Sequence, residues 1–166
     1  MKRLLFIVFL TIAILGCEKI YGPPVPFYQE RSIRVICFYS EKVEQERLTL
    51  RICETLRVIE TNENYQKIGG SNEYGAYQFT KSTWDYWNEK LLSYPLDWTL
   101  PHHQDLLAYK KVLFLVEQNY SPSEIAAIWN CGEPDWRGRK GINRYGVPYN
   151  VPYYVYKFER HFYTLN

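Results

Sequence analysis

The chain has 166 residues, of which 46% are hydrophobic and 17% aromatic, and its formal net charge at pH 7 is +2. This length and hydrophobic content are sufficient for one domain with its own core. The near-neutral charge excludes the marked basic excess of a nucleic-acid-binding surface, so we expect no nucleic-acid partner.

The first sixteen residues predict a targeting signal. Lys2 and Arg3 precede an apolar run over residues 4–15 that is too short for a comfortable transmembrane helix. The run ends in Ile14-Leu15-Gly16-Cys17, which resembles a bacterial lipobox, where the cysteine is acylated and becomes the new N-terminus. We therefore predict a lipoprotein signal peptide at 1–16 and a lipid on Cys17 that anchors the protein to a membrane, on the periplasmic face of the bacterial cell envelope. An ordinary secretory signal cut elsewhere and a short uncleaved anchor are the alternatives.

Residues 17–40 are predicted to form a tether. The segment Gly22-Pro23-Pro24-Val25-Pro26 is typical of extended chain, and Ser32 to Tyr39 could be a short strand or part of the tether. Removal of residues 1–16 leaves 18 basic and 18 acidic residues. The sequence shows no internal repeat and no sign of a second domain. We therefore expect residues 41–166 to form one small, mainly α domain that is a monomer.

Glu41 to Glu60 is predicted to be a long first helix. Its apolar face follows helical spacing through Leu48, Ile52 and Leu56 to Glu60, and is widened by Leu50, Cys53 and Ile59. A carboxyl group against apolar neighbours resists ionisation, which is the property that the general acid of a glycosidase requires. The alternative is a glutamate at the helix end that turns to solvent.

The segment after this helix predicts a loop followed by a second helix. Gly69-Gly70 is expected to end the first helical region, and Gly75 to let the backbone pass close to another group. The loop carries the amide of Gln78 and two aromatic rings, and Thr80 is a predicted N-cap for a helix over 81–87.

The rest of the chain predicts alternating helices and loops. Residues 91–101 are expected to form a loop, and residues 102–119 an apolar helix. A further helix is expected over 124–130. It is opened by a capping box of Ser121 and Glu124, with Pro122 at the first helical position. The segment 132–147 is expected to be a loop and 151–162 the terminal helix.

We assign no metal and no cofactor. Cys37, Cys53 and Cys131 are an odd number of cysteines in an exported chain, which leaves at least one unpaired. No cysteine or histidine spacing is typical of zinc, and His102-His103 is expected in the first turn of a helix.

Four short motifs, in one order over residues 48–158, resemble those of lytic transglycosylases and the related resuscitation-promoting-factor domains. That family carries a Glu-Ser pair, a Gly-x-x-Gln loop with a Thr-Trp helix start, an Ala-x-Tyr-Asn-Ala-Gly motif and a Tyr-Val-x-Lys-Val ending. The matching residues here are Glu60-Thr61, Gly75-Ala76-Tyr77-Gln78 with Thr83-Trp84, Ala126-Ala127-Ile128-Trp129-Asn130-Cys131-Gly132 and Tyr154-Val155-Tyr156-Lys157-Phe158.

The chain also departs from the family pattern. Thr61 replaces the usual serine and keeps a hydroxyl group, whereas Trp129 and Cys131 stand where tyrosine and alanine are usual. Asn150 stands where the family often has a glutamate. The last three departures bear on the sugar contacts and leave the general acid and the Gln78 loop unaffected.

The resemblance implies a lysozyme-like fold and the cleavage of peptidoglycan glycan strands between N-acetylmuramic acid and N-acetylglucosamine. Glu60 would be the single general acid and base, and the muramyl O6 would attack to give a 1,6-anhydro product. Gln78 and Asn130 would bind the acetamido group or orient the acid, and Tyr154 would bond to the glutamate or the sugar. Further substrate-binding residues implied by the motifs are Thr61, Gly75, Tyr77 and Trp129. Ordinary structural roles are the alternatives: a turn stabiliser for Gln78, a helix C-cap for Asn130 and a core residue for Tyr154.

Two other functions fit the same residues. A lysozyme would hydrolyse the same bond with water and needs a second carboxylate, for which Glu73 is the first candidate and Asp85 the second. A cell-wall-binding lipoprotein could keep the fold without activity, but a pure binder gains nothing from a half-buried acid at Glu60.

Overall fold

The structure is a computed structural model that describes residues 27–143 and 145–164, with side chains from residue 37 on. The predicted signal peptide, Cys17 and the proline-rich part of the tether therefore lie outside the described residues. The chain divides into two units, Met1–Glu44 and Gln45–Asn166. The described residues of the first unit, 27–44, are helical, and the second unit contains all the other described elements.

The first described helix, α2, spans Phe27–Thr61 and contains the whole predicted helix 41–60. The expectation of a strand or an extended tether at 32–39 is wrong, because those residues are helical. The physical reason lies in the sequence: no glycine or proline occurs from Phe27 to Thr61, so nothing interrupts the helix after Pro26.

The end of α2 also differs from the prediction. The helix stops at Thr61, where Asn62 and Glu63 take left-handed backbone angles with φ of 52° and 66°. Their amides donate to the carbonyls of Val58 and Arg57 at 2.8 and 3.2 Å, which caps the helix. Gly69 and Gly70 have no positive φ and play no part in ending the helix.

Four further helices follow: α3 (Lys81–Leu91), α4 (Pro101–Glu117), α5 (Pro122–Cys131) and α6 (Val151–Phe162). Two predicted caps are confirmed. The side chain of Thr80 accepts a hydrogen bond from the amide of Thr83, and Ser121 and Glu124 form the reciprocal capping box of α5. The terminal helix has the predicted bounds.

A short hairpin occupies part of the predicted loop 132–147 and the residues after it. Strand β1 (Lys140–Ile142) pairs antiparallel with β2 (Pro148–Asn150), with Lys140 opposite Asn150 and Ile142 opposite Pro148. Both strands are exposed along their length, so they lack the alternation of apolar and polar residues that would have predicted them.

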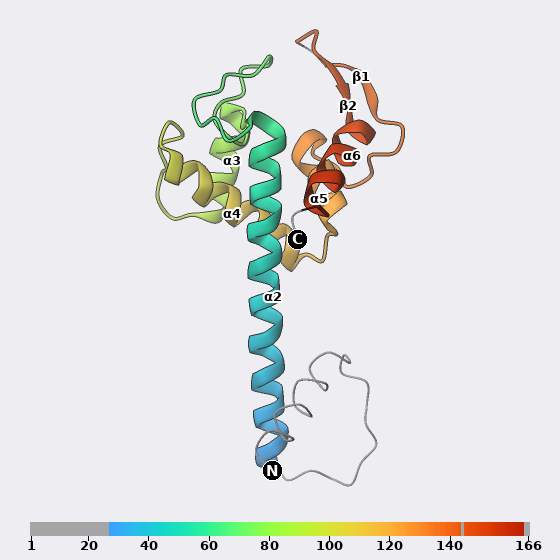
Figure 1. Cartoon of the computed structure of the whole chain (residues 1–166). Coiled ribbons are helices and arrows are strands. Elements are labelled where there is room, and N and C mark those ends of the chain that lie inside the picture. The colour runs from blue at the N-terminus through green and yellow to red at the C-terminus, as the bar shows by residue number, and fades with distance from the viewer. Residues whose placement is uncertain (1–26, 144, 165–166) are drawn as a thin grey trace. The chain divides into compact units, whose positions relative to one another are not determined.

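The core of the second unit lies among the helices. In Figure 1, α3 and α4 lie to one side of the end of α2, and α5, α6 and the hairpin lie to the other. Helix α5 packs against α6, and α3 packs against α4. Ile52 and Leu56 are fully buried, whereas Leu50, which was expected to widen the apolar face, is 59% exposed. The largest fully buried apolar side chains of this core are Ile52, Leu56, Leu107, Ile125, Val112, Val151, Val155 and Phe158.

The described chain is thus mainly α-helical with one small two-stranded sheet, which confirms the predicted fold class at that level. A helix with the length and apolarity to cross a membrane does not occur among the described residues.

Candidate active site

Glu60 lies in the last turn of α2, and its carboxyl group is partly buried. The Tyr154 hydroxyl, from the first part of α6, donates a hydrogen bond of 2.6 Å to Glu60 Oε1. Tyr154 is itself buried, so the bond joins, inside the protein, two helices that are far apart in the sequence. Of the two partners that the family resemblance implied for Tyr154, the glutamate or the sugar, the structure has the hydrogen bond to the glutamate.

The surroundings of Glu60 disfavour its charged form. Burial raises the pKa of Glu60 from 4.5 to about 7, and the negative charge of Glu73 acts in the same direction. The hydrogen bond from Tyr154 and the positive charges of Lys157 and Lys111 act in the opposite direction. The burial effect prevails, so a large fraction of Glu60 carries a proton near neutral pH.

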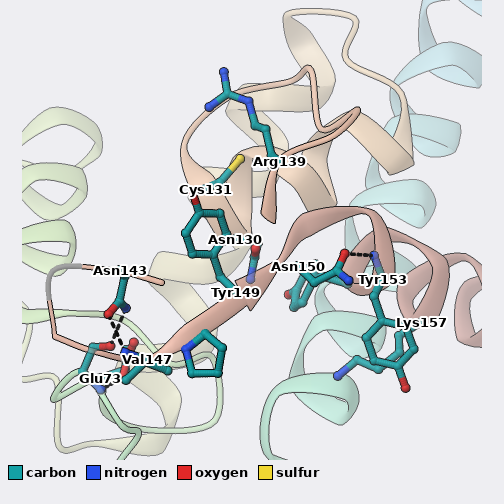
Figure 2. A pocket seen from close by; sticks show the side chains of 13 residues that line it. Glu73, Asn130, Cys131, Arg139, Asn143, Val147, Tyr149, Asn150, Tyr153 and Lys157 are labelled. Carbon is teal, nitrogen blue, oxygen red and sulfur yellow. Dashed lines mark hydrogen bonds between the residues drawn. The ribbon is translucent and has the colours of Figure 1, made fainter. Parts of the chain in front are cut away.

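Tyr154 forms part of the lining of a cavity of about 490 Å³ (Figure 2), whereas Glu60 itself is not among the residues that line it. In Figure 2, Glu73 and Asn143 stand at one end of the cavity and Lys157 at the other. Two exposed aromatic rings, Tyr149 and Tyr153, also line it. The remaining lining residues are Ser71, Asn130, Cys131, Arg139, Val147, Pro148 and Asn150. Such a mixture of polar groups and rings is suited to a sugar, which presents hydroxyl groups and apolar C–H faces together.

The hairpin and the loop after α2 form part of the wall of this cavity, and α5 and α6 contribute the rest. The Asn143 amide donates to Ser71 Oγ at 3.1 Å and thereby ties the turn of the hairpin to the loop. The Ser71 backbone amide donates to Glu73 Oε2 at 2.7 Å, which holds the Glu73 carboxylate in place. Glu73 is therefore a fixed charge at the cavity rather than a free side chain in a solvated turn.

The loop that carries the Gly75 motif is anchored from within. Gly75 has a φ of +80°, and a Cβ atom there would lie 2.1 Å from Gln104 Oε1. Gln104, which is buried on α4, accepts from the Ala76 amide at 2.8 Å and donates to the carbonyls of Tyr65 and Trp98. The expectation that Gly75 permits a close approach is confirmed, and the neighbouring group is Gln104.

Gln78 and Thr61 make hydrogen bonds within the same loop. The Gln78 amide nitrogen donates to the carbonyls of Gly75 and Lys67 at 2.8 and 3.2 Å. The Thr61 hydroxyl donates to the Ala76 carbonyl at 3.1 Å. These bonds fit the turn-stabilising alternative for Gln78, and neither residue lines a described cavity.

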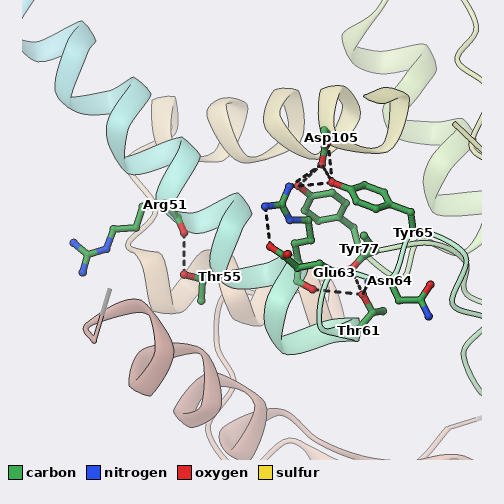
Figure 3. A network of polar contacts seen from close by, with 10 residues as sticks. Arg51, Thr55, Thr61, Glu63, Asn64, Tyr65, Tyr77 and Asp105 are labelled. Atoms are coloured by element: carbon green, nitrogen blue, oxygen red, sulfur yellow. Dashed lines mark hydrogen bonds and ion pairs between the residues drawn. The ribbon is translucent and has the colours of Figure 1, made fainter. Parts of the chain in front are cut away.

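Tyr77 belongs to a polar network that clamps the loop to α2 and α4 (Figure 3). Its hydroxyl donates to Asp105 at 2.9 Å, and the Tyr65 hydroxyl donates to the same carboxylate at 2.8 Å. Arg57 lies 3.5 Å from Asp105 and donates to the Tyr65 hydroxyl at 2.9 Å. Tyr77 is buried, and its hydroxyl is committed to this network.

A second cavity, of about 580 Å³, shares Asn130 and Cys131 with the first. Trp129 lines the second cavity and donates through its indole N–H to the Tyr77 carbonyl at 3.2 Å. Asn130 is exposed, and its side chain makes no hydrogen bond within the described part of the chain. The two cavities therefore meet at the end of α5, where an amide group is available to a ligand.

Among the predicted site residues, Glu60 contacts Tyr154, and Tyr154 lines the first cavity together with Asn130. Trp129 lies in the neighbouring cavity, and Glu60 itself lines none of the described cavities. Asp85 lies apart from both cavities, exposed on α3 and paired with Lys81.

Lys111 was not among the residues predicted from the sequence. This lysine is only 3% exposed and its charge acts on Glu60. A signal was present, because Lys111 interrupts the apolar row of Leu107 and Leu115 at helical spacing on α4.

Comparisons with known proteins add no relative: no protein-family model, no curated protein and no solved structure matches the chain. Over the described residues, no group of three or more histidine, cysteine or acidic side chains lies together as a metal-binding cluster.

Proposed function

We propose that the protein is a lytic transglycosylase with a lysozyme-like domain, which cleaves the β-1,4 bond between N-acetylmuramic acid and N-acetylglucosamine in peptidoglycan. The observation that carries this proposal is the Glu60 carboxyl, whose pKa is raised to about 7 and which is held by Tyr154, a residue that lines the first cavity. A carboxylic acid that keeps its proton near neutral pH is the group that glycosidic bond cleavage requires.

In the proposed reaction Glu60 donates its proton to the glycosidic oxygen as the bond from that oxygen to the muramyl C1 breaks. The departing N-acetylglucosamine leaves as an alcohol, and the substrate's own N-acetyl group stabilises the positive charge that develops at C1. The muramyl O6 then forms a bond to C1, and its proton passes to the Glu60 carboxylate. The acid is thereby restored, and the product is a 1,6-anhydro sugar.

The other residues of the site have supporting roles in this proposal. Tyr154 orients the Glu60 carboxyl through its hydrogen bond. Asn130 is available to the acetamido group because its side chain is exposed where the two cavities meet. Gly75, Tyr77, Gln78 and Thr61 shape the loop instead of touching the sugar, as their hydrogen bonds and burial suggest.

Hydrolysis by a lysozyme mechanism is the second candidate, and the position of Glu73 favours it. Glu73 lines the same cavity as Tyr154, and its charge acts on Glu60. A second carboxylate at the cavity could activate a water molecule. We prefer the transglycosylase because the Ser71 amide already engages the Glu73 carboxylate.

Replacement of the acid tests the proposal. Glu60→Gln preserves the shape of the side chain but removes the proton, so we expect release of soluble muropeptides from purified peptidoglycan to fall by roughly a hundred- to ten-thousand-fold. Glu54→Gln is the matched control, because Glu54 lies exposed on the same helix. If the folded Glu60 variant releases muropeptides at the rate of the Glu54 variant, Glu60 is not the acid.

A further inference from the structure

The second cavity contains a buried lysine that forms no salt bridge with the described residues. Lys111, on α4, is 3% exposed and lines the cavity. Within the part of the chain that the structure describes, its ammonium group makes no ion pair and no hydrogen bond, and the lining of the cavity includes no aspartate or glutamate. An ammonium group that is largely removed from bulk water is costly to keep charged, unless water or a ligand in the cavity supplies an acceptor.

Aromatic rings hold the ammonium group in place. Lys111 Nζ lies 3.9 Å from the centroid of Trp129, 5.4 Å from that of Trp87 and 5.5 Å from that of Phe79. These rings come from α5, α3 and the preceding loop, so three separate segments converge on one cation. Cation–π contacts stabilise the charge, but they offer no hydrogen-bond acceptor to its N–H groups.

Hydrogen-bonding groups surround the cavity. Thr83 and Ser82 contribute hydroxyl groups from the first turn of α3, and Asn130 contributes an amide group. The Thr83 hydroxyl accepts from Thr80 Oγ1 at 2.8 Å and so keeps its own proton for another acceptor. One cation and these neutral polar groups, with no carboxylate among them, are suited to a small anion.

We propose that this cavity binds a carboxylate group of the substrate, with Lys111 as its cationic partner. That the carboxylate belongs to a muramyl unit rests on the proposed function; the carboxylate site itself rests on Lys111 and its surroundings. In peptidoglycan such a group has two sources: the lactyl carboxylate of a muramyl residue without a peptide, and a carboxylate of the peptide stem. Because both cavities share Asn130, a glycan bound in the cavity that Tyr154 lines can extend a group into the cavity that Lys111 lines.

The pH dependence of binding has a defined sign. Burial lowers the pKa of Lys111 from 10.5 to about 7, and the charge of Glu60 on α2 acts in the opposite direction. The other titratable groups that line the cavity are Tyr86 on α3 and Cys131 on α5. Since a carboxylate binds to the protonated lysine, its affinity should fall as pH rises through about 7, whereas an exposed lysine would hold it to much higher pH.

Calorimetric titration of the full chain with three monosaccharide probes tests the inference. N-acetylglucosamine is neutral, N-acetylmuramic acid carries the lactyl carboxylate, and muramyl dipeptide carries a stem carboxylate in its place. At about pH 6 we expect at least one of the two acids to bind roughly ten- to a hundredfold more tightly than N-acetylglucosamine, as for a hydrogen bond to a charged group. The acid that gains affinity identifies the source.

Two variants and a pH series complete the test. Lys111→Met should abolish the tighter binding of the acid relative to N-acetylglucosamine. Lys90→Met should keep this difference in affinity, because Lys90 lies over the same Trp87 ring, at 4.9 Å, without lining the cavity. If Lys111→Met does not fold, the wild-type series decides, since the gain must shrink as pH rises through about 7. A gain that is absent, that survives in folded Lys111→Met or that does not change with pH overturns the inference. None of the probes has a glycosidic bond between two sugars, so these outcomes are independent of whether the protein cleaves glycan.

Discussion

Glu60 is held between groups that act on its charge in opposite directions. Burial and Glu73 keep the proton on the carboxyl, and Tyr154, Lys157 and Lys111 favour its loss. A general acid needs such a balance, because a group with a very high pKa donates its proton poorly and one with a low pKa has no proton to donate. The effect of each neighbour on the pKa of Glu60 can therefore be tested by replacing that neighbour and measuring the pH at which activity is lost.

Tyr154→Phe removes the hydrogen bond that favours the ionised form of Glu60. The pKa of Glu60 should rise, so the alkaline limb of the pH profile of kcat/KM should move to higher pH. At the optimum, kcat/KM should fall roughly tenfold because the carboxyl loses the bond that orients it. Tyr156→Phe, on the exposed side of α6, is the control. An alkaline limb that stays in place in Tyr154→Phe would show that the 2.6 Å bond does not act on the catalytic acid.

Glu73→Gln should shift the pKa of Glu60 in the opposite direction from Tyr154→Phe. Loss of this negative charge should lower the pKa of Glu60 and move the alkaline limb to lower pH. We expect only a modest loss of rate and an unchanged anhydro product, because the substrate supplies its own nucleophile. If Glu73 activates water, the loss should instead match that of Glu60→Gln, and reducing-end products should vanish. Mass spectrometry of digested sacculi separates the two.

The loop between α2 and α3 positions the site without forming much of its surface. Gly75 packs on Gln104, and Tyr77 and Tyr65 bind Asp105, so the loop is fixed to α4 at two points. These contacts hold Ser71 and Glu73 against the hairpin. The geometry at Glu60 thus depends on backbone conformation several residues away.

Gly75→Ala should destabilise the fold by at least roughly 2 kcal/mol, because the new Cβ atom strains a positive φ and displaces a buried, hydrogen-bonded amide. Gly138→Ala is the matched control, since Gly138 has a φ of +74° with no heavy atom within 4 Å of the added Cβ atom. Urea unfolding of both variants isolates the contribution of Gln104. Equal losses of unfolding free energy in the two variants would mean that the close packing of Gly75 on Gln104 does not contribute to stability.

Much of this architecture could be predicted from local sequence signals, and the failures have physical causes. The bounds of α6 and the caps at Thr80 and Ser121 followed from residue chemistry that acts within one turn. The hairpin strands lacked a buried face, and so gave no alternation to detect. The contact of Glu60 with Tyr154 joins residues 94 positions apart, which only the resemblance to a family had suggested.

Taken as a whole, the molecule combines a described helical domain with an N-terminal segment, outside the described residues, that we predict to carry a lipid. An enzyme that acts on the insoluble cell wall benefits from such an anchor, because it stays close to its substrate. The near-balance of basic and acidic residues fits a glycan better than a polyanion.

Cys17→Ala tests the anchor. Without the cysteine no acyl chains can be added, so the protein should leave the membrane fraction or accumulate as an unprocessed precursor. Cell fractionation with Cys37→Ala as control, which leaves Cys17 in place, measures the effect. A processed Cys17→Ala protein that remains in the membrane fraction would contradict the lipoprotein prediction.

The most direct test of the central claim is mass spectrometry of the fragments that the wild-type protein releases from purified sacculi. We predict muropeptides that end in 1,6-anhydromuramic acid, and their loss in Glu60→Gln. Reducing-end muropeptides, or anhydro products that persist when Glu60 is replaced, would contradict the account.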